Sequence, residues 1–398
     1  MVEFYRIKQK NGLTILFERR DMPIVTMIIA TRAGSAHESE QKKGMAHFFE
    51  HMPFKGTKTR TAKQISSTIE KVGGVLNAFT SDEITSFWCK VPSKHFYSGS
   101  NIIFDLVANP MLDSKDIEKE RNVILSEISR AHDMPEHYLF DKIKELLYKK
   151  PFGMPVLGFK ETVSRLKRED FLKWHNHYSP ENMIVAAVGN ANLKDISDLA
   201  KLYFKKTYKK SNLPKPVVIK KSSQFNETRE GLEQTHIALG FHMPSFSDKN
   251  RYASEVFNAI LGEGMSSKLF QEVREKRGLA YSIHSSLSQE KSYGYMVVYA
   301  GIDKKNIKKV KEITLKEIKS MSSINLRDFE EAKEQKIGNW QLDLEACDKV
   351  AVNLVIQEIA TKADDFYDYI ENISDVSLKD VKSLVKIKEH SVAVIASK

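Results

Sequence analysis

Five consecutive residues, His47-Phe48-Phe49-Glu50-His51, combine two imidazoles four positions apart with a carboxylate beside the second. In a helix, positions i and i+4 lie one turn apart on the same face, so both imidazoles can direct a ring nitrogen at one ion. Glu50 lies on nearly the same face, where it can accept a proton from a water molecule that zinc has made more acidic. The order His-x-x-Glu-His inverts the commoner zinc-protease motif. The stretch therefore predicts a hydrolytic zinc site.

A catalytic zinc site needs a third protein ligand, and the candidates are Glu120 and Glu127. Both belong to residues 113–131, which have the apolar periodicity of a long amphipathic helix. Because they are seven positions apart, or two helical turns, the two carboxylates share a face and could line one wall of a metal site. The alternative is a solvated acidic stripe, which is the usual place of Glu on so charged a helix. The residues by themselves leave both interpretations open.

Three segments carry a family resemblance: GMAHFFEHMPFKGT, GGVLNAFTSDEITSFWCKV and ERNVILSEI. They resemble the pitrilysin (insulinase-type) zinc peptidases, which include the mitochondrial processing peptidases, and the resemblance extends over almost the whole chain. That family has its third zinc ligand, a Glu, 76 positions after the second His, and Glu127 is 76 positions after His51. The resemblance implies that Zn²⁺ is held by His47, His51 and Glu127, that Glu50 is the base, and that Glu120 orients the ligands or tunes the metal.

In the second half, AILGEGMSSKLFQEVREKRGLAYSIHS resembles the family's glycine-containing loop followed by an Arg and a Tyr, here Arg274 and Tyr281. The resemblance implies that Tyr281 donates to the oxyanion and that Arg274 holds the substrate backbone. Without it, Tyr281 would be interpreted as a half-buried strand aromatic and Arg274 as an ordinary helix charge. One departure from the family is Pro53, where relatives often have an aliphatic residue. Pro53 predicts that the ligand helix ends abruptly.

Residues 76–80 align with the edge strand that the family places beside the zinc. An extended peptide could add to that edge through main-chain hydrogen bonds that do not depend on its sequence. Asn77, Ala78 and Phe79 are therefore candidate substrate-binding residues. The alternative is an ordinary sheet strand with Phe79 in the core.

The two halves of the chain show the same order of expected elements, and 398 residues suit two domains. We expect a zinc-binding domain at residues 1–212, a linker rich in Lys, Ser and Pro at 213–228, and a second domain at 229–398. The fold class predicted is α+β, with two similar domains in a clamshell. Each domain would have a largely antiparallel sheet with helices on one side.

Individual elements follow from periodicity and caps. Strands are expected at 24–31, 75–91, 183–189, 235–241, 281–287, 293–301 and 391–397. Helices are expected near 94–107, 113–131, 139–148, 251–260, 266–276, 304–320 and 326–345. A capping box of Thr61 and Gln64 predicts a further helix at 62–72.

Composition excludes several classes of protein. The first twenty residues carry charge throughout, so we expect neither a signal peptide nor a membrane span. The expected protein is therefore a cytoplasmic enzyme. The net charge is +10, but Lys and Arg are interleaved with Glu, which indicates a solvated surface and no nucleic-acid partner. Cys89 and Cys347 are isolated and form no CxxC pair, so neither a disulfide framework nor a cysteine zinc site is expected.

The function predicted is that of a zinc metalloendopeptidase acting on peptides or unfolded segments in an enclosed chamber. In larger relatives with four domains, the zinc domain faces a domain from the other end of the polypeptide. A two-domain chain therefore implies a homodimer in which each copy supplies Arg274 and Tyr281 to the zinc of the other. The rival is a non-catalytic or regulatory subunit of a peptidase-like complex. Such subunits usually lack a ligand or the base, whereas this chain has both.

Overall fold

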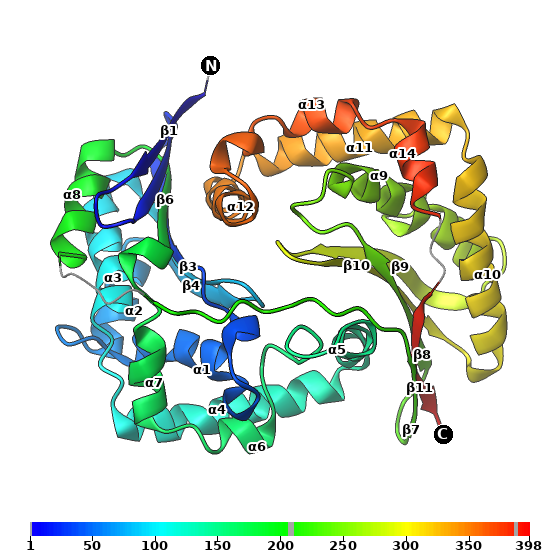
Figure 1. Ribbon diagram of the computed structural model, residues 1–398, viewed down its shortest axis with the longest axis horizontal. Helices are drawn as coiled ribbons and strands as arrows, with labels where there is room; N and C mark the ends of the chain where they lie inside the picture. Colours follow the sequence, from blue (N-terminus) through cyan, green and yellow to red (C-terminus); the bar gives the residue numbers. More distant parts are fainter. Residues whose placement is uncertain (1, 206–210, 386–388) are drawn as a thin grey trace. The chain divides into compact units, whose positions relative to one another are not determined.

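In the computed structural model, which describes residues 2–205, 211–385 and 389–398, strands form one sheet of six and one of five (Figure 1). The first sheet has the order β1-β2-β6-β3-β5-β4 and the second has the order β7-β11-β8-β10-β9. The strands of the first sheet are β1 (Glu3–Lys8), β2 (Thr14–Arg19), β3 (Ile24–Thr31), β4 (Val75–Thr80), β5 (Thr85–Pro92) and β6 (Met183–Gly189). Those of the second are β7 (Gln224–Arg229), β8 (Thr235–Met243), β9 (Ala280–Gln289), β10 (Gly294–Ile302) and β11 (Ser391–Ser397).

The two sheets repeat one topology. From β2 in one sheet and β7 in the other, the strand order is first, fifth, second, fourth and third in both. Strand β2 pairs with β6 in parallel in the first sheet, and β7 pairs with β11 in parallel in the second. All other neighbouring strands of these two sets of five are antiparallel. The expected α+β fold with two similar, largely antiparallel sheets is confirmed.

The chain divides into two compact units, each with its own hydrophobic core. The first unit comprises Met1–Ile128, Pro155–Pro216 and Asp343–Phe366, and the second comprises Ser129–Met154, Val217–Leu342 and Tyr367–Lys398. Helices of the first are α1 (Met45–His51), α2 (Ala62–Glu70), α3 (Phe96–Ala108), most of α4 (Ser114–Asp133), α6 (Lys160–Val163), α7 (Arg168–His175), α8 (Leu193–Tyr203) and α12 (Cys347–Ala360). Helices of the second are α5 (Pro135–Leu147), α9 (Arg251–Gly262), α10 (Ile307–Ser320), α11 (Leu326–Asp343), α13 (Tyr369–Ser374) and α14 (Leu378–Ser383).

Each unit includes one helix from the other half of the sequence. In the first unit, α12 packs against β3 and β6. In the second, α5 packs against β8 and β11, so closely that a Cβ on Gly240 would come within 2.3 Å of Ile143 Cγ2. The compact units therefore differ from the expected ranges 1–212 and 229–398 in these two segments.

Most expected elements are found near their predicted positions. Strands 24–31, 183–189 and 391–397 have the predicted bounds, and the capping box of Thr61 and Gln64 opens α2. Helices α6, α7, α8, α12, α13 and α14 and strands β1, β2 and β7 were not expected, and β7 overlaps the end of the expected linker at 213–228. Cys89 and Cys347 are buried free thiols. Among the described helices, none has the length and apolarity needed to cross a bilayer.

Candidate metal centre

The ligand helix α1 is held at its N-terminal end by a buried carboxylate. Glu38 accepts hydrogen bonds from the backbone amides of Gly44 at 3.0 Å and Ala46 at 2.6 Å. Its side chain is fully buried and forms an ion pair at 3.3 Å with Lys43, whose ammonium also donates to the backbone oxygen of Ser35. Amides at the start of a helix lack intrahelical acceptors, so a carboxylate placed there satisfies two of them. The start of α1 is thereby attached to the preceding loop.

The other end of α1 is set by Pro53 and by the loop that follows. The α-helix ends at His51, and a short 3₁₀ turn, Met52–Lys55, contains Pro53. The α-helix therefore ends close to Pro53, but its end is less abrupt than predicted, because the chain continues as a 3₁₀ turn to Lys55.

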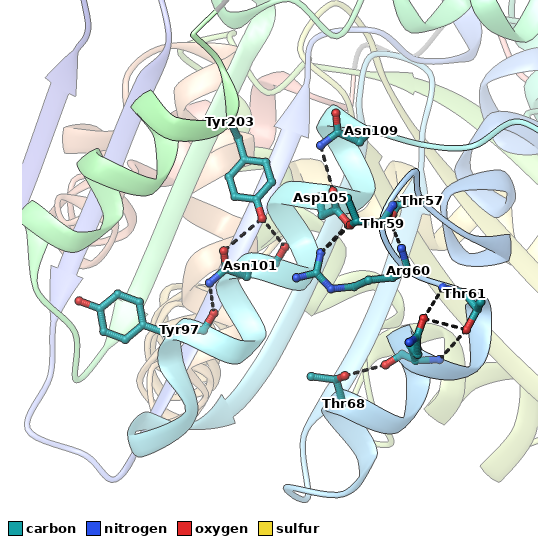
Figure 2. Close-up of polar contacts among 11 residues, drawn as sticks. Thr57, Thr59, Arg60, Thr61, Thr68, Tyr97, Asn101, Asp105, Asn109 and Tyr203 are labelled. Carbon is teal, nitrogen blue, oxygen red and sulfur yellow. Dashed lines mark hydrogen bonds and ion pairs between the residues drawn. The ribbon is translucent and has the colours of Figure 1, made fainter.

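The loop after this turn converges on Asp105 of α3, as Figure 2 shows. Asp105 is 1 % exposed and accepts hydrogen bonds from Thr57, Thr59 and Arg60 at 2.6 to 2.7 Å. Asn109 donates to its second oxygen at 2.9 Å. Burial acts to raise the pKa of Asp105, but these hydrogen bonds lower it by more than burial raises it. The pKa of Asp105 therefore lies below its usual value.

We expect Asp105→Asn to lower the free energy of unfolding by about 2 kcal/mol, since Arg60 and two hydroxyls lose their charged acceptor. The loss should be smaller in acid. The folded-state pKa of Asp105 is depressed, so its stabilisation is present above the unfolded pKa of about 4 and disappears as pH falls. Urea unfolding at several pH values measures this. Asp198→Asn, at an exposed carboxylate paired with Lys194, is the matched control and should change little.

His47, His51 and Glu127 come together as the motif and the resemblance predicted. One ligand atom from each residue lies within 4.8 Å of the other two. The Nε2 atoms of His47 and His51 lie 3.8 and 3.6 Å from Glu127 Oε2. In a tetrahedral zinc site with bonds of about 2.0–2.2 Å, neighbouring ligand atoms are about 3.3–3.6 Å apart, so both distances from Glu127 Oε2 are close to those that one ion would impose. No second group of this kind occurs in the described parts of the chain.

A buried atom without a partner also supports a cation here. Within the described residues, Glu127 Oε2 is buried and has no hydrogen-bond partner. An unsatisfied buried carboxylate oxygen is costly, whereas coordination to a metal satisfies it. The donor set of two imidazoles and one carboxylate is one that catalytic zinc uses.

The pKa values of the two imidazoles are shifted in opposite directions. Burial, with a smaller contribution from His51, lowers the pKa of His47 to about 3, so this ring is neutral and able to bind a metal. For His51, burial acts to lower the pKa, but the hydrogen bond that its ring donates to Glu120 and the charges of Glu127 and Glu50 raise it more. The negative charge of the surrounding carboxylates therefore favours positive charge at His51. A divalent metal ion bound there would supply that positive charge.

Glu120 lies behind His51, as the resemblance implied. Its Oε1 is 2.9 Å from His51 Nδ1 and its Oε2 is 2.5 Å from Lys55 Nζ. When Nδ1 carries the proton that Glu120 accepts, Nε2 is left free for a metal. Burial acts to raise the pKa of Glu120, but its bonds to His51 and Lys55 lower it more. Glu120 and Glu127 thus occupy one face of α4, directed at the two nitrogens of one ring.

Glu50 is partly buried beside this group. Thr80, the last residue of β4, donates a hydrogen bond of 2.6 Å to Glu50 Oε2. Burial raises the pKa of Glu50, and the hydrogen bond from Thr80 and the charge of His51 only partly oppose that rise. A carboxylate with a raised pKa is suited to accepting and then releasing a proton near neutral pH.

Strand β4 is the outermost strand of its sheet and packs beside α1. Ala78 faces the core with Leu76, whereas Asn77 and Phe79 face the other side of the sheet, where Trp88 and Ser86 stand opposite them. Phe79 is therefore not a core residue of this layer, contrary to the alternative interpretation. The Oδ1 atom of Asn77 accepts a hydrogen bond of 2.8 Å from the amide of Ala78.

Arg274 and Tyr281 lie together in the second unit. Arg274 belongs to a π-helical segment, Phe270–Glu275, and its guanidinium carbon is 5.9 Å from the ring centre of Tyr281 and 4.8 Å from that of Phe270. Tyr281, near the start of β9, is 76 % exposed, so it is not the half-buried strand aromatic of the alternative interpretation. Large exposed aromatics of this kind are typical of binding surfaces.

Sequence reasoning missed Thr80 and Lys55, which contact Glu50 and Glu120, and Glu38, which holds the start of the ligand helix. The alternation of β4 places Thr80 on the same face as Ala78, which was the available indication of its direction. Lys55 and Glu38 gave no comparable indication, because Lys and Glu near a helix end are usually solvated.

The chain resembles known peptidases over its full length. The family model described as "Insulinase (Peptidase family M16)" matches residues 14–159, and "Peptidase M16 inactive domain" matches residues 165–336. The first range contains all the metal-site residues, and the second contains Arg274 and Tyr281.

Among curated relatives, an uncharacterised zinc protease of Rickettsia bellii is 36 % identical over 86 % of this chain and 84 % of its own length. An uncharacterised zinc protease of Bacillus subtilis is 29 % identical over 97 % of both chains. Among solved structures, a protease from Helicobacter pylori superposes with a TM-score of 0.91 at 23 % identity, covering 99 % of this chain and all of its own. A peptidase M16 inactive domain from Pseudomonas fluorescens gives a TM-score of 0.89 at 16 % identity, covering 100 % and 98 %.

Proposed function

This chain belongs to the insulinase family of peptidases, family M16, and on that premise we propose that it is a zinc-dependent metalloendopeptidase. The observation that supports the proposal is the proximity of His47 Nε2 and His51 Nε2 to Glu127 Oε2, at 3.8 and 3.6 Å. A non-catalytic subunit would not need to retain both a complete ligand set and a base beside it. Its substrates are peptides or unfolded segments, whose main chain can reach such a site.

The residues around the site have distinct tasks in this mechanism. Zinc, when bound, supplies a Lewis acid that polarises the peptide carbonyl and makes water more acidic. Glu50 accepts a proton from water as the water oxygen attacks the carbonyl carbon. Glu50 then donates that proton to the peptide nitrogen as the C–N bond breaks. Glu120 holds His51 in the tautomer that leaves Nε2 free.

The free edge of β4 supports a proposal for substrate binding. A peptide that added to this edge would make main-chain hydrogen bonds around Asn77, Ala78 and Phe79, independent of its sequence. Its side chains would alternate between the α1 face and the face that Phe79 shares. Sequence-tolerant binding of extended chain suits a peptidase with varied substrates.

A second copy of the chain would complete each site. We infer a homodimer in which Tyr281 of one copy donates to the oxyanion formed at the zinc site of the other, and Arg274 holds the substrate backbone. The exposure of Tyr281 and its proximity to Arg274 support this role. Because both half-sites occur in one chain, identical copies suffice.

Zinc binding and chelation test the proposal. The purified protein should bind one zinc per chain and cleave a mixed peptide pool, and a chelator should stop cleavage until zinc is restored. Glu127→Gln should weaken zinc binding at least ~100-fold, because one of three protein ligands loses its charge. Glu118→Gln, at an exposed carboxylate of the same helix, is the control. Protein that binds zinc but cleaves nothing would instead indicate a non-catalytic subunit.

A further inference from the structure

We propose that Thr80 is a positioning residue that holds Glu50 and determines which of its carboxylate oxygens is free to take the proton from water. This inference rests on the proposed function and names a further residue of the same site. It links the base to β4, the strand along which the substrate would align.

The hydrogen-bond geometry assigns the direction of the contact. Thr80 Oγ1 is 2.6 Å from Glu50 Oε2 and 3.5 Å from Thr85 Oγ1. Thr85 already donates its own hydroxyl proton to the backbone oxygen of Ala33 at 2.9 Å. The shorter contact to a charged acceptor is much the stronger, so the proton of Thr80 goes to Glu50. One of the two acceptor positions of Glu50 Oε2 is thereby filled, and we assign Oε1 as the oxygen that takes the proton from water.

Thr80 can hold Glu50 only if its own backbone is fixed, and the turn after β4 fixes it. Thr80 pairs with Thr85 at the end of the β4–β5 register, and the amide of Ser81 donates to Ile84 O at 2.8 Å. The turn is also attached to the loop before α1, because Ser35 N donates to Ser81 O at 3.0 Å and Ala36 N to Asp82 O at 2.8 Å.

That loop packs directly against the turn. A Cβ on Gly34 would lie 2.5 Å from Ile84 N and from Ser81 O, so the two backbones are in direct contact. The same loop carries Glu38, which holds the first amides of α1. Hydrogen bonds therefore connect strand β4, the loop and the ligand helix, and the bond from Thr80 to Glu50 joins β4 to the helix directly.

As a consequence, strand β4 would position both the base Glu50 and the substrate. A peptide hydrogen-bonded to the edge of β4 has its carbonyl groups positioned by that strand. The same strand positions the carboxylate through Thr80. Small displacements matter at such a site, since moving a reacting group by about 1 Å can cost about 100-fold in rate. Loss of the hydroxyl should therefore affect turnover more than substrate binding.

The test compares Thr80→Val, which removes the hydroxyl with little change of shape, with Thr80→Ser, which keeps it. On a peptide that the wild type cleaves, Thr80→Val should lower kcat about 10- to 100-fold with KM and zinc content within about twofold of wild type. Thr80→Ser should stay within about threefold of wild type in kcat. Thr26→Val is the matched control, because Thr26 is a buried residue of the same sheet whose hydroxyl has no hydrogen-bond partner among the described residues.

Crystal structures of the two variants give a readout that does not depend on activity. Glu50 should keep its side-chain conformation in Thr80→Ser and leave it in Thr80→Val. A Thr80→Val enzyme with wild-type kcat and an unmoved Glu50 would overturn the inference while the proposed peptidase function stands. If the wild type cleaves no peptide yet Glu50 moves only in Thr80→Val, the positioning role stands and the proposed function fails.

Discussion

Glu50→Gln should lower kcat for peptide hydrolysis by about 10³- to 10⁴-fold while the protein still binds one zinc per chain. Glutamine has nearly the shape of glutamate and can keep the contact to Thr80, but it cannot accept a proton from water or return one to the leaving amine. Zinc should remain bound because Glu50 is not one of the three candidate ligand residues, His47, His51 and Glu127. The loss should therefore be confined to turnover.

Metal analysis and single-turnover kinetics on the same preparation separate the two effects. Glu70→Gln, on the nearby helix α2 and outside the metal group, should match the wild type in both measurements. A Glu50→Gln protein with full turnover would remove Glu50 from the role of general base. A protein that had lost its zinc would show instead that Glu50 is needed to hold the metal.

Two inactive variants should restore activity to each other when mixed. His51→Ala lacks a zinc ligand, and Tyr281→Phe lacks the hydroxyl assigned to the oxyanion, a loss of the kind that costs about 10²- to 10³-fold. In a dimer of one chain of each variant, the intact zinc site of the Tyr281→Phe chain would receive the intact Tyr281 of the His51→Ala chain. Random reassociation of equal amounts gives half mixed dimers with one working site each, or about a quarter of wild-type activity.

The control is each variant alone, unfolded and refolded in the same way, with its oligomeric state measured by light scattering. Activity that appears only in the mixture would establish that sites are completed by a second copy. If the mixtures stay inactive while each variant still dimerises, then Tyr281 does not act on the partner's zinc, and the shared-site arrangement is wrong.

The metal-binding residues could be predicted because local geometry restricts them. His47, Glu50 and His51 lie within one turn of helix, and Glu120 and Glu127 are two turns apart on another, so each set shares a face wherever the helix lies. The pairing of the two sets could not be derived from spacing. It came from the family resemblance, and the structure places Glu127 3.6 Å from His51.

Helix α12 shows why part of the fold was missed. Its buried side carries Val350, Leu354 and Val355, but apolar Val352 and Ile356 lie on the opposite, less buried side. A helix with apolar residues on both sides lacks the periodicity by which an amphipathic helix is identified. It packs on β3 and β6, far from it in sequence, and only the packed structure reveals that partner.

The sequence by itself determined the ligand types, their helical spacing and the repeated order of strands and helices, because each depends on residues close together along the chain. Tertiary structure alone decided which oxygen of Glu50 is held by Thr80, how Glu38 and Asp105 fasten the two ends of the ligand segment, and where α5 and α12 pack. These contacts join residues that are distant in sequence. They form only when burial brings their elements together and leaves each polar group to find the partner that water no longer provides.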